Sequence, residues 1–285
     1  MNSPFPKTQS NSLRKLVRDG YAKIAQDTAA GCCSPGVSCC GSAPQDADQL
    51  ARELGYTVEE LQALPDGANM GLSCGNPAAL AALKPGETVL DLGSGGGFDI
   101  FIAGRKIGAT GHAIGVDMTP EMLAKARNNI AHYTKETGLN NVEFRLGEIE
   151  HLPVADNSVD VIISNCVINL SPDKAQVWRE IARVLKPGGR VAVSDMALLK
   201  PLPPEILKMV EALVGCVAGA ALVKDTEEQA RAAGLSPVAV RVKPEYVSAM
   251  VHFEDPLYRK LVAMLPPGTS PDDYVASVEV TARKA

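Results

Sequence analysis

Aromatic side chains are scarce in this sequence: they make up 4% of its 285 residues, although 46% of the residues are hydrophobic. We therefore predict a core built from aliphatic side chains. A positive net charge is also missing, since the formal net charge is −5 at pH 7. Nucleic-acid-binding domains usually carry a basic face, so we expect no nucleic-acid partner. The chain is long enough for one large domain or for a core with an extension.

Long apolar runs are absent as well. No run approaches the roughly 18 residues that a membrane-spanning helix needs, and the best candidate, 209–223, is shorter and contains Glu211. The polar N-terminus has no apolar segment of the kind found in signal peptides. These patterns predict a cytoplasmic protein that has no membrane partner, and we expect it to be a monomer.

Residues 89–99 hold the motif around which the rest of the chain is organised. Val89–Leu92 is an apolar run that predicts a buried strand, Gly93–Gly97 predicts a sharp turn, and residues 100–107 predict a helix. A strand, a glycine turn and a helix open a nucleotide-binding α/β unit. The plain alternative is that the glycines only connect a strand to a helix.

The spacing of these glycines indicates which nucleotide would bind. Dinucleotide-binding sites have the motif G-x-G-x-x-G, and in this sequence Phe98 occupies the position of the third glycine. Asp91, at the strand end, would repel a pyrophosphate but would attract a cationic ligand without phosphate. S-adenosylmethionine, an amino acid that bears a sulfonium group, meets this requirement. The next predicted strand, 112–117, ends at Asp117, which is placed to bind ribose hydroxyls, and Met118 is placed to pack on adenine.

The remaining periodicity predicts the fold class. Strands alternate with helices from residue 88 to residue 195, and two further strands are predicted at 238–242 and 274–283. Alternation of this kind gives an α/β fold with a parallel sheet. An amphipathic helix is predicted at 12–26, and a longer one at 203–221 places Cys216 at the edge of its apolar stripe.

The sequence holds seven cysteines, which are Cys32, Cys33, Cys39, Cys40, Cys74, Cys166 and Cys216. In a reducing compartment they are expected to be thiols unless chemistry oxidises them, and such a set more often indicates metal, metalloid or redox chemistry than a disulfide scaffold. The first four form two vicinal pairs without the C-x₂-C spacing of a zinc site. They are either incidental thiols of a flexible tail or a mobile reservoir that binds a soft ion or passes disulfide equivalents.

The other three cysteines, Cys74, Cys166 and Cys216, lie on separate predicted elements that can meet at the carboxyl edge of the sheet. Thiolates select soft ions, and three of them can bind a trivalent pnictogen while leaving its lone pair free. No histidine lies at an obvious position for a general base, which favours an acceptor that is already nucleophilic. The alternative for each cysteine is a small, buried, apolar side chain.

Several longer motifs resemble those of the bacterial arsenite S-adenosylmethionine methyltransferases, which are class I methyltransferases. They are GANMGLSCGNP at 67–77, DLGSGGGF at 91–98, VDMTPEM at 116–122, SNCVINL at 164–170 and the pair Gly215-Cys216. The resemblance covers most of residues 50–225 and implies a Rossmann-like fold with a mostly parallel seven-stranded sheet. We accordingly divide the chain into an N-terminal extension with a cysteine loop, 1–66, and a methyltransferase domain, 67–285. Substrate-covering insertions are expected at about 200–225 and 244–272.

The resemblance implies methyl transfer from S-adenosylmethionine to trivalent arsenic, as arsenite or methylarsenite, in arsenic detoxification. Cys166 and Cys216 match the principal arsenic ligands of the family, and Cys74 matches a third family cysteine. A further N-terminal family cysteine is assigned to Cys33, although its three neighbours compete for that role. The predicted cofactor-binding residues are Asp91, Gly93, Ser94, Gly95, Asp117, Met118, Glu148, Ile149 and Asn165.

The expected partners follow from this chemistry. Arsenite would arrive as a thiol conjugate, and thioredoxin or glutathione would act as the external thiol reductant that clears a cysteine disulfide. Two alternatives stay open. One is a small-molecule methyltransferase of the quinone or sterol type, which would share the cofactor site. The other is a thiol-rich metalloid-binding protein that has no catalytic activity.

Overall fold

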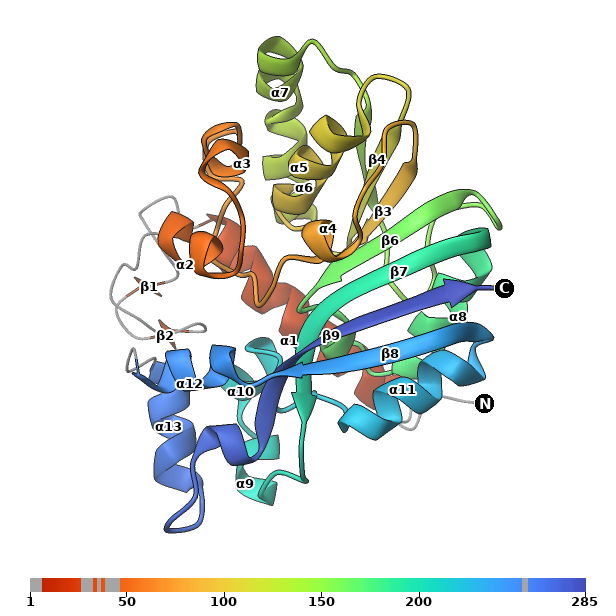
Figure 1. Ribbon diagram of the computed structural model, residues 1–285. Helices are drawn as coiled ribbons and strands as arrows, with labels where there is room; N and C mark the ends of the chain where they lie inside the picture. Colours follow the sequence, from red (N-terminus) through yellow and green to blue (C-terminus); the bar gives the residue numbers. More distant parts are fainter. Residues whose placement is uncertain (1–6, 27–32, 35–36, 39–46, 253–255) are drawn as a thin grey trace.

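A seven-stranded sheet forms the centre of the protein, seen in a computed structural model that describes residues 7–26, 33–34, 37–38, 47–252 and 256–285 (Figure 1). The strands lie in the order β5-β4-β3-β6-β7-β9-β8. They are β3 (Thr88–Leu92), β4 (His112–Asp117), β5 (Val142–Leu146), β6 (Val159–Asn165), β7 (Leu185–Leu198), β8 (Leu235–Lys243) and β9 (Val275–Lys284). The first five in this order pair in parallel, and β9 runs antiparallel to both β7 and β8. The predicted mostly parallel seven-stranded sheet is confirmed.

Helices cover both faces of the sheet, so the central strands are buried on both sides. One layer contains α4 (Pro77–Leu80), α5 (Phe98–Ile107), α6 (Pro120–Asn128) and α7 (Ile130–Thr137), and the other contains α8 (Lys174–Val184) and α11 (Val223–Ala232). Neighbouring residues of β6 point to opposite faces of the sheet. Val161 belongs to the apolar cluster of Phe101 in α5, whereas Ile162 belongs to that of Trp178 in α8.

Three of the described helices precede α4 in the sequence. They are α1 (Lys7–Gln26), α2 (Ala47–Glu53) and α3 (Val58–Gln62). The helix predicted at 12–26 is present and begins five residues earlier, at Lys7. A two-stranded antiparallel ribbon, β1 (Cys33–Ser34) and β2 (Val37–Ser38), lies between α1 and α2 in the sequence. Cys33 therefore belongs to β1, whereas Cys32, Cys39 and Cys40 lie outside the described residues.

A second apolar cluster lies beyond the end of the sheet, where α12 (Glu245–His252) and α13 (Pro256–Met264) group with α9 (Pro204–Leu207) and α10 (Val210–Val214) in Figure 1. Short 3₁₀ turns, η1 (Ile168–Leu170) and η2 (Pro271–Asp273), complete this region. Among the described helices, none is both long and apolar enough to cross a membrane.

The single helix predicted at 203–221 is wrong. The segment instead forms α9 and α10, and Cys216 lies after α10 in a left-handed conformation with φ +62°. The reason lies in tertiary packing, because a side chain at Gly219 would collide with the carbonyl oxygen of Asn169 in η1. The chain leaves the helix so that this glycine can approach η1 closely.

Candidate functional site

A cavity of about 120 Å³ lies at the carboxyl ends of β3, β4 and β6. Ligands bind at this edge in open α/β sheets. All of the predicted cofactor-binding residues line the cavity except Glu148. The carboxylate of Glu148 instead forms an ion pair with Arg14 of α1, at 3.3 Å, and the next acidic residue, Glu150, lines the cavity.

The glycine turn between β3 and α5 shapes the floor of this cavity. Gly93, Gly95 and Gly97 have φ values of +70°, +50° and +92°, which glycine adopts without steric cost. The Asp117 carboxylate holds the turn, because it accepts a hydrogen bond of 2.9 Å from the backbone N–H of Gly95. It also accepts one of 2.8 Å from the N–H of Thr119. The predicted strand, turn and helix are therefore all present.

Three buried carboxylates make the cavity favourable for a cation. Burial raises the pKa of Asp91 well above its usual range, and repulsion from Asp99 and Asp117 adds to this shift. Burial also raises the pKa of Asp117, and raises that of Asp99 to about 6. Two hydrogen bonds partly offset the effect of burial on the pKa of Asp99. They come from the Tyr56 hydroxyl, at 2.7 Å, and from Asn165 Nδ2, at 3.3 Å.

Asp91 and Ser94 have unused hydrogen-bonding capacity at this cavity. The Asp91 carboxylate makes no hydrogen bond within the described part of the chain, and the buried Ser94 hydroxyl has none there either. A ligand with a positive charge and hydrogen-bonding groups would satisfy both residues. The ammonium and sulfonium groups of S-adenosylmethionine fit this donor and acceptor set.

Helix α1 closes one side of the cavity, which the sequence did not reveal. Arg14, Val17 and Tyr21 line the cavity from one face of the helix. Arg14 Nη2 also lies 3.1 Å from the Glu150 carboxylate, so that an ion pair ties α1 to the segment after β5. Val17 and Tyr21 belong to the apolar stripe that predicted this helix, whereas Arg14 does not, and periodicity alone does not say what a stripe covers.

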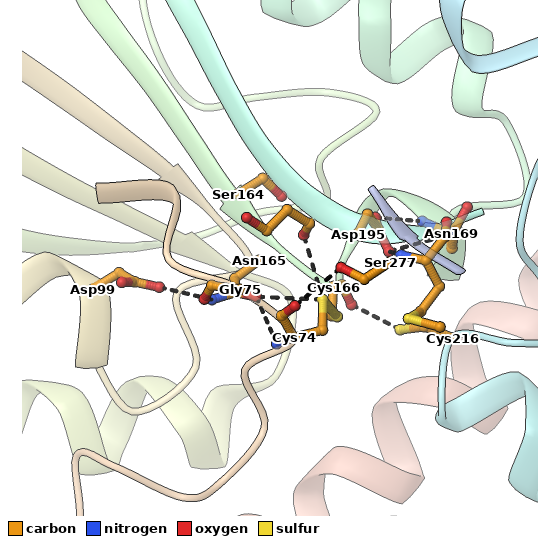
Figure 2. Close-up of a disulfide and its surroundings, with 12 residues drawn as sticks. Cys74, Gly75, Asp99, Ser164, Asn165, Cys166, Asn169, Asp195, Cys216 and Ser277 are labelled. Carbon is orange, nitrogen blue, oxygen red and sulfur yellow. Dashed lines mark hydrogen bonds between the residues drawn. A yellow bond between two sulfur atoms is a disulfide. The ribbon is translucent and has the colours of Figure 1, made fainter. Parts of the chain in front are cut away.

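Cys74 and Cys166 are joined by a disulfide bond, with their Cα atoms 6.2 Å apart (Figure 2). This pair is therefore oxidised, the exception that the expectation of thiols allowed. The side chain of Asn165 explains the proximity: its Oδ1 accepts a hydrogen bond of 3.0 Å from the N–H of Cys74, and its Nδ2 donates one of 2.9 Å to the Gly75 carbonyl. These bonds hold the Cys74 loop against the end of β6.

Cys216 lies beside this disulfide as a buried free thiol, which donates a hydrogen bond of 2.8 Å to the carbonyl oxygen of Cys166. Cys166 and Cys216 both adopt left-handed backbone conformations, with φ +55° and +62°. Such conformations cost about 1–3 kcal/mol in a residue with a side chain and often occur at functional sites. Burial, with a contribution from Asp195, raises the pKa of the Cys216 thiol well above its usual range, so the thiol is protonated at neutral pH.

The three predicted cysteines are thus brought together from three separate elements, while Cys166 alone among them also lines the cavity of Asp91 and Asp117. In this oxidised state two of the sulfurs are bonded to each other. Within the described ranges, no cluster of three or more histidine, cysteine, aspartate or glutamate side chains could hold a metal ion. The fourth predicted cysteine, Cys33, is placed by its backbone only.

Comparisons with known proteins agree with this geometry. The family described as "Methyltransferase domain" matches residues 83–235. An arsenite methyltransferase from Halobacterium salinarum is 49% identical over 236 residues, which cover 81% of this chain and 59% of the relative. Another, from Aquipseudomonas alcaligenes, is 39% identical over 228 residues, which cover 79% and 62%. The chain thus spans about three fifths of the length of these curated relatives.

A solved structure adds a match over more of both chains. The crystal structure of an arsenic(III) S-adenosylmethionine methyltransferase from Chlamydomonas reinhardtii is 32% identical, with a TM-score of 0.61, and the match covers 85% of this chain and 75% of that one. The family match spans more than half of this chain and includes the glycine turn, β4 and β6. The chain therefore belongs to the methyltransferase domain family, and the arsenite methyltransferases are among its relatives.

Proposed function

We propose that this protein transfers a methyl group from S-adenosylmethionine to trivalent arsenic that is bound by cysteine sulfur, as arsenite or methylarsenite. One observation carries the proposal: Cys166 lines the cavity of the buried carboxylates and lies in contact with both Cys74 and Cys216. The names of the relatives support the choice of arsenic as acceptor.

The cofactor side of the proposal rests on the charges of the cavity. When bound, S-adenosylmethionine supplies an electrophilic methyl group on a cationic sulfur. The Asp91 carboxylate would face the cationic methionine end together with the Gly93–Gly95 turn. The Asp117 carboxylate, which already accepts two backbone hydrogen bonds, would accept further ones from ribose hydroxyls through its remaining lone pairs. The Ser94 hydroxyl, which has no partner among the described residues, would form a hydrogen bond to the cofactor.

The acceptor side rests on the cysteines. An external thiol, from glutathione or thioredoxin, must first reduce the Cys74–Cys166 bond. Arsenite, arriving as a thiol conjugate, would then exchange its ligands for Cys74, Cys166 and Cys216, and each incoming thiol would pass its proton to a departing ligand. Three sulfur ligands leave the arsenic lone pair free as the nucleophile, so no general base is needed.

Methylation formally oxidises arsenic from the trivalent to the pentavalent state. Two of the cysteine thiolates can supply the two electrons that return it to the trivalent state, and their sulfurs become a disulfide. The Cys74–Cys166 bond is the form that such a step would leave behind. Cys33 is the N-terminal cysteine that we propose to accept this disulfide by thiol–disulfide exchange, before the external thiol reduces it.

The direct test is to incubate the purified protein with arsenite, a thiol and S-adenosylmethionine and to separate the arsenic species. Methylated arsenic is the expected product, and it should disappear in a Cys166→Ser variant. Unfolding measurements with and without the cofactor serve as the control, because Cys166→Ser should keep its stabilisation by the cofactor. A Cys166→Ser variant that methylates arsenite at the normal rate would contradict the proposal.

The same assay distinguishes the two alternative functions. Methylation of a quinone acceptor but not of arsenite would favour the other methyltransferase class. Binding of arsenite without formation of demethylated cofactor would favour a binding protein without catalytic activity.

A further inference from the structure

A second cavity, of about 500 Å³, lies on the other side of the disulfide. Cys74, Gly75 and Asn76 line it, whereas Leu72 and Ser73, the residues just before them, line the cavity of the buried carboxylates. Cys166 lines only the first cavity and Cys74 lines only the second. The disulfide therefore crosses the wall between two separate cavities.

Polar side chains of three strands form one wall of this second cavity. The register of the sheet aligns Ser194 of β7 with Glu279 of β9 and Glu279 with Arg241 of β8. Ser277 and Lys243 are paired in the same way two residues along. Residues that are directly paired across strands point to the same face of a sheet, so the five side chains form a polar patch, and all of them line the cavity.

The cavity has a charged mouth and a buried inner end. The side chains of Arg241 and Lys243 are 76% and 37% exposed, and Glu279 lies 3.9 Å from the first and 3.5 Å from the second. At the inner end, Cys74 and Ser194 are 2% and 1% exposed. Glu53 also lines the cavity, so two cationic and two anionic side chains are present.

The hydroxyl of Ser194 marks the inner end as a binding position. It is buried and has no hydrogen-bond partner among the described residues. The backbone carbonyl of the same residue lies 3.6 Å from Cys74 Sγ and accepts a hydrogen bond of 2.8 Å from the N–H of Cys166. A hydroxyl donor beside the disulfide is suited to hold an approaching thiolate, since a buried polar group without a partner is costly.

We propose that this cavity binds a small peptide-like thiol that carries carboxylate and ammonium groups, and delivers its sulfur to Cys74. The balanced, mixed charges at the mouth match a zwitterionic ligand, and the volume suits a small molecule. A protein thiol is disfavoured because Cys74 is buried at the inner end of the cavity. This inference rests on the proposed function and adds the route by which the reductant enters.

The exchange balances as two thiol–disulfide steps. The ligand thiolate attacks Cys74 Sγ along the line of the disulfide, the Cys74–Cys166 bond breaks, and Cys166 leaves as a thiolate on the side of the first cavity. A second ligand thiolate then attacks the ligand sulfur of the mixed disulfide, which yields the oxidised ligand and a Cys74 thiolate. Two thiols are oxidised and one protein disulfide is reduced.

The test measures reduction of the oxidised protein by glutathione, by uncharged 2-mercaptoethanol and by cationic cysteamine, with each rate expressed per thiolate. Neither arsenic nor a methyl donor is added, so this assay and the methylation assay can fail independently. The double variant Arg241→Glu/Lys243→Glu should lower the ratio of the glutathione rate to the cysteamine rate about tenfold. Lys224→Glu, an exposed charge reversal on α11, is the matched control and should leave the ratio unchanged. Equal ratios in both variants would overturn the proposal.

Two further measurements locate the attack. Alkylation followed by peptide mass spectrometry should find the mixed disulfide on Cys74 and the alkyl group on Cys166, and the reverse assignment would contradict the route. Saturation with S-adenosylhomocysteine, with binding verified by calorimetry, should change the glutathione rate by less than about twofold, because the first cavity is not used. Strong inhibition would show that the thiol enters through the first cavity instead.

Discussion

At the scale of single residues, Asn165 explains why the two halves of the site meet. The sequence predicted it as a cofactor-binding residue, and it does line the first cavity. Its side chain also holds the backbone of Cys74 and Gly75 and donates to Asp99. Such a network is not visible in a linear motif, because the Cys74 partner, for example, lies 91 residues away.

Asp91 should control the affinity for the cationic cofactor. Asp91→Asn is expected to weaken cofactor binding about 10- to 100-fold, which corresponds to the loss of one hydrogen bond to a charged group. In the wild-type protein, affinity should increase with pH as the carboxyl group, whose pKa is raised by burial, loses its proton. Calorimetric titrations at several pH values measure both effects. The rise with pH should become shallower in Asp91→Asn, and an unchanged pH profile would exclude this role.

Asp195 should make the stability of the protein depend on pH. It is fully buried, burial raises its pKa from 3.8 to about 6, and it accepts a hydrogen bond of 2.9 Å from Asn169. Because the folded state binds this proton more tightly, its contribution is present below pH 3.8 and is lost as the pH rises through about 6. The unfolding free energy of Asp195→Asn, measured relative to that of the wild type, should therefore rise by up to about 3 kcal/mol when the pH is raised from 4 to 7.5. Denaturant titrations at the two pH values provide the measurement, and an equal difference at both would contradict the assignment.

At the scale of elements, the sequence predicts best those strands and turns whose formation depends on neighbouring residues in the chain. The glycine turn, β3 and β4 follow from spacing and residue type alone. The end of α10 before Cys216 does not, because it depends on the close approach of Gly219 to Asn169. A disulfide was expected in the reaction, but its pairing was not, since it joins residues 92 positions apart and periodicity carries no information on such pairs.

Helix α1 is expected to act as a cover for the first cavity. The cavity volume of about 120 Å³ is below the roughly 300 Å³ at which ligand pockets usually begin, so we expect α1, which lines it, to shift when a nucleoside binds. Arg14→Gln removes the ion pairs with Glu148 and Glu150 and should raise hydrogen exchange across 7–26 and weaken cofactor binding severalfold, about the effect of one or two partly exposed ion pairs. Lys15→Gln, on the same helix and paired within the described part of the chain only with Asp19, is the control. The same exchange pattern in both variants would show that α1 has no such role.

At the scale of the whole molecule, ligand binding should be visible as a change in stability. Cofactor at about 100 times its dissociation constant should add about 2.7 kcal/mol to the unfolding free energy. Arsenite should add to this only after the Cys74–Cys166 bond has been reduced, because in the oxidised protein Cys216 is the one free thiol of the three proposed arsenic ligands. Thermal unfolding of both redox forms, with Cys216→Ser as a comparison, measures the difference. Equal stabilisation of the oxidised protein by arsenite would rule out the shared cysteine site.

The hydrogen bonds from Asn165 to the Cys74 loop have a consequence for the timing of turnover. Because these bonds reach the backbone of Cys74 and Gly75 rather than the sulfurs, we expect the two sulfurs to stay neighbours after reduction and to act as a chelating pair of high effective concentration. A chelate of this kind releases its ion slowly by simple dissociation. Under the proposed mechanism, re-forming the sulfur–sulfur bond removes two arsenic ligands at once. Reduction of the arsenic and ejection of the methylated product then become a single event, and each enzyme molecule completes one cycle before it must wait for the next thiol.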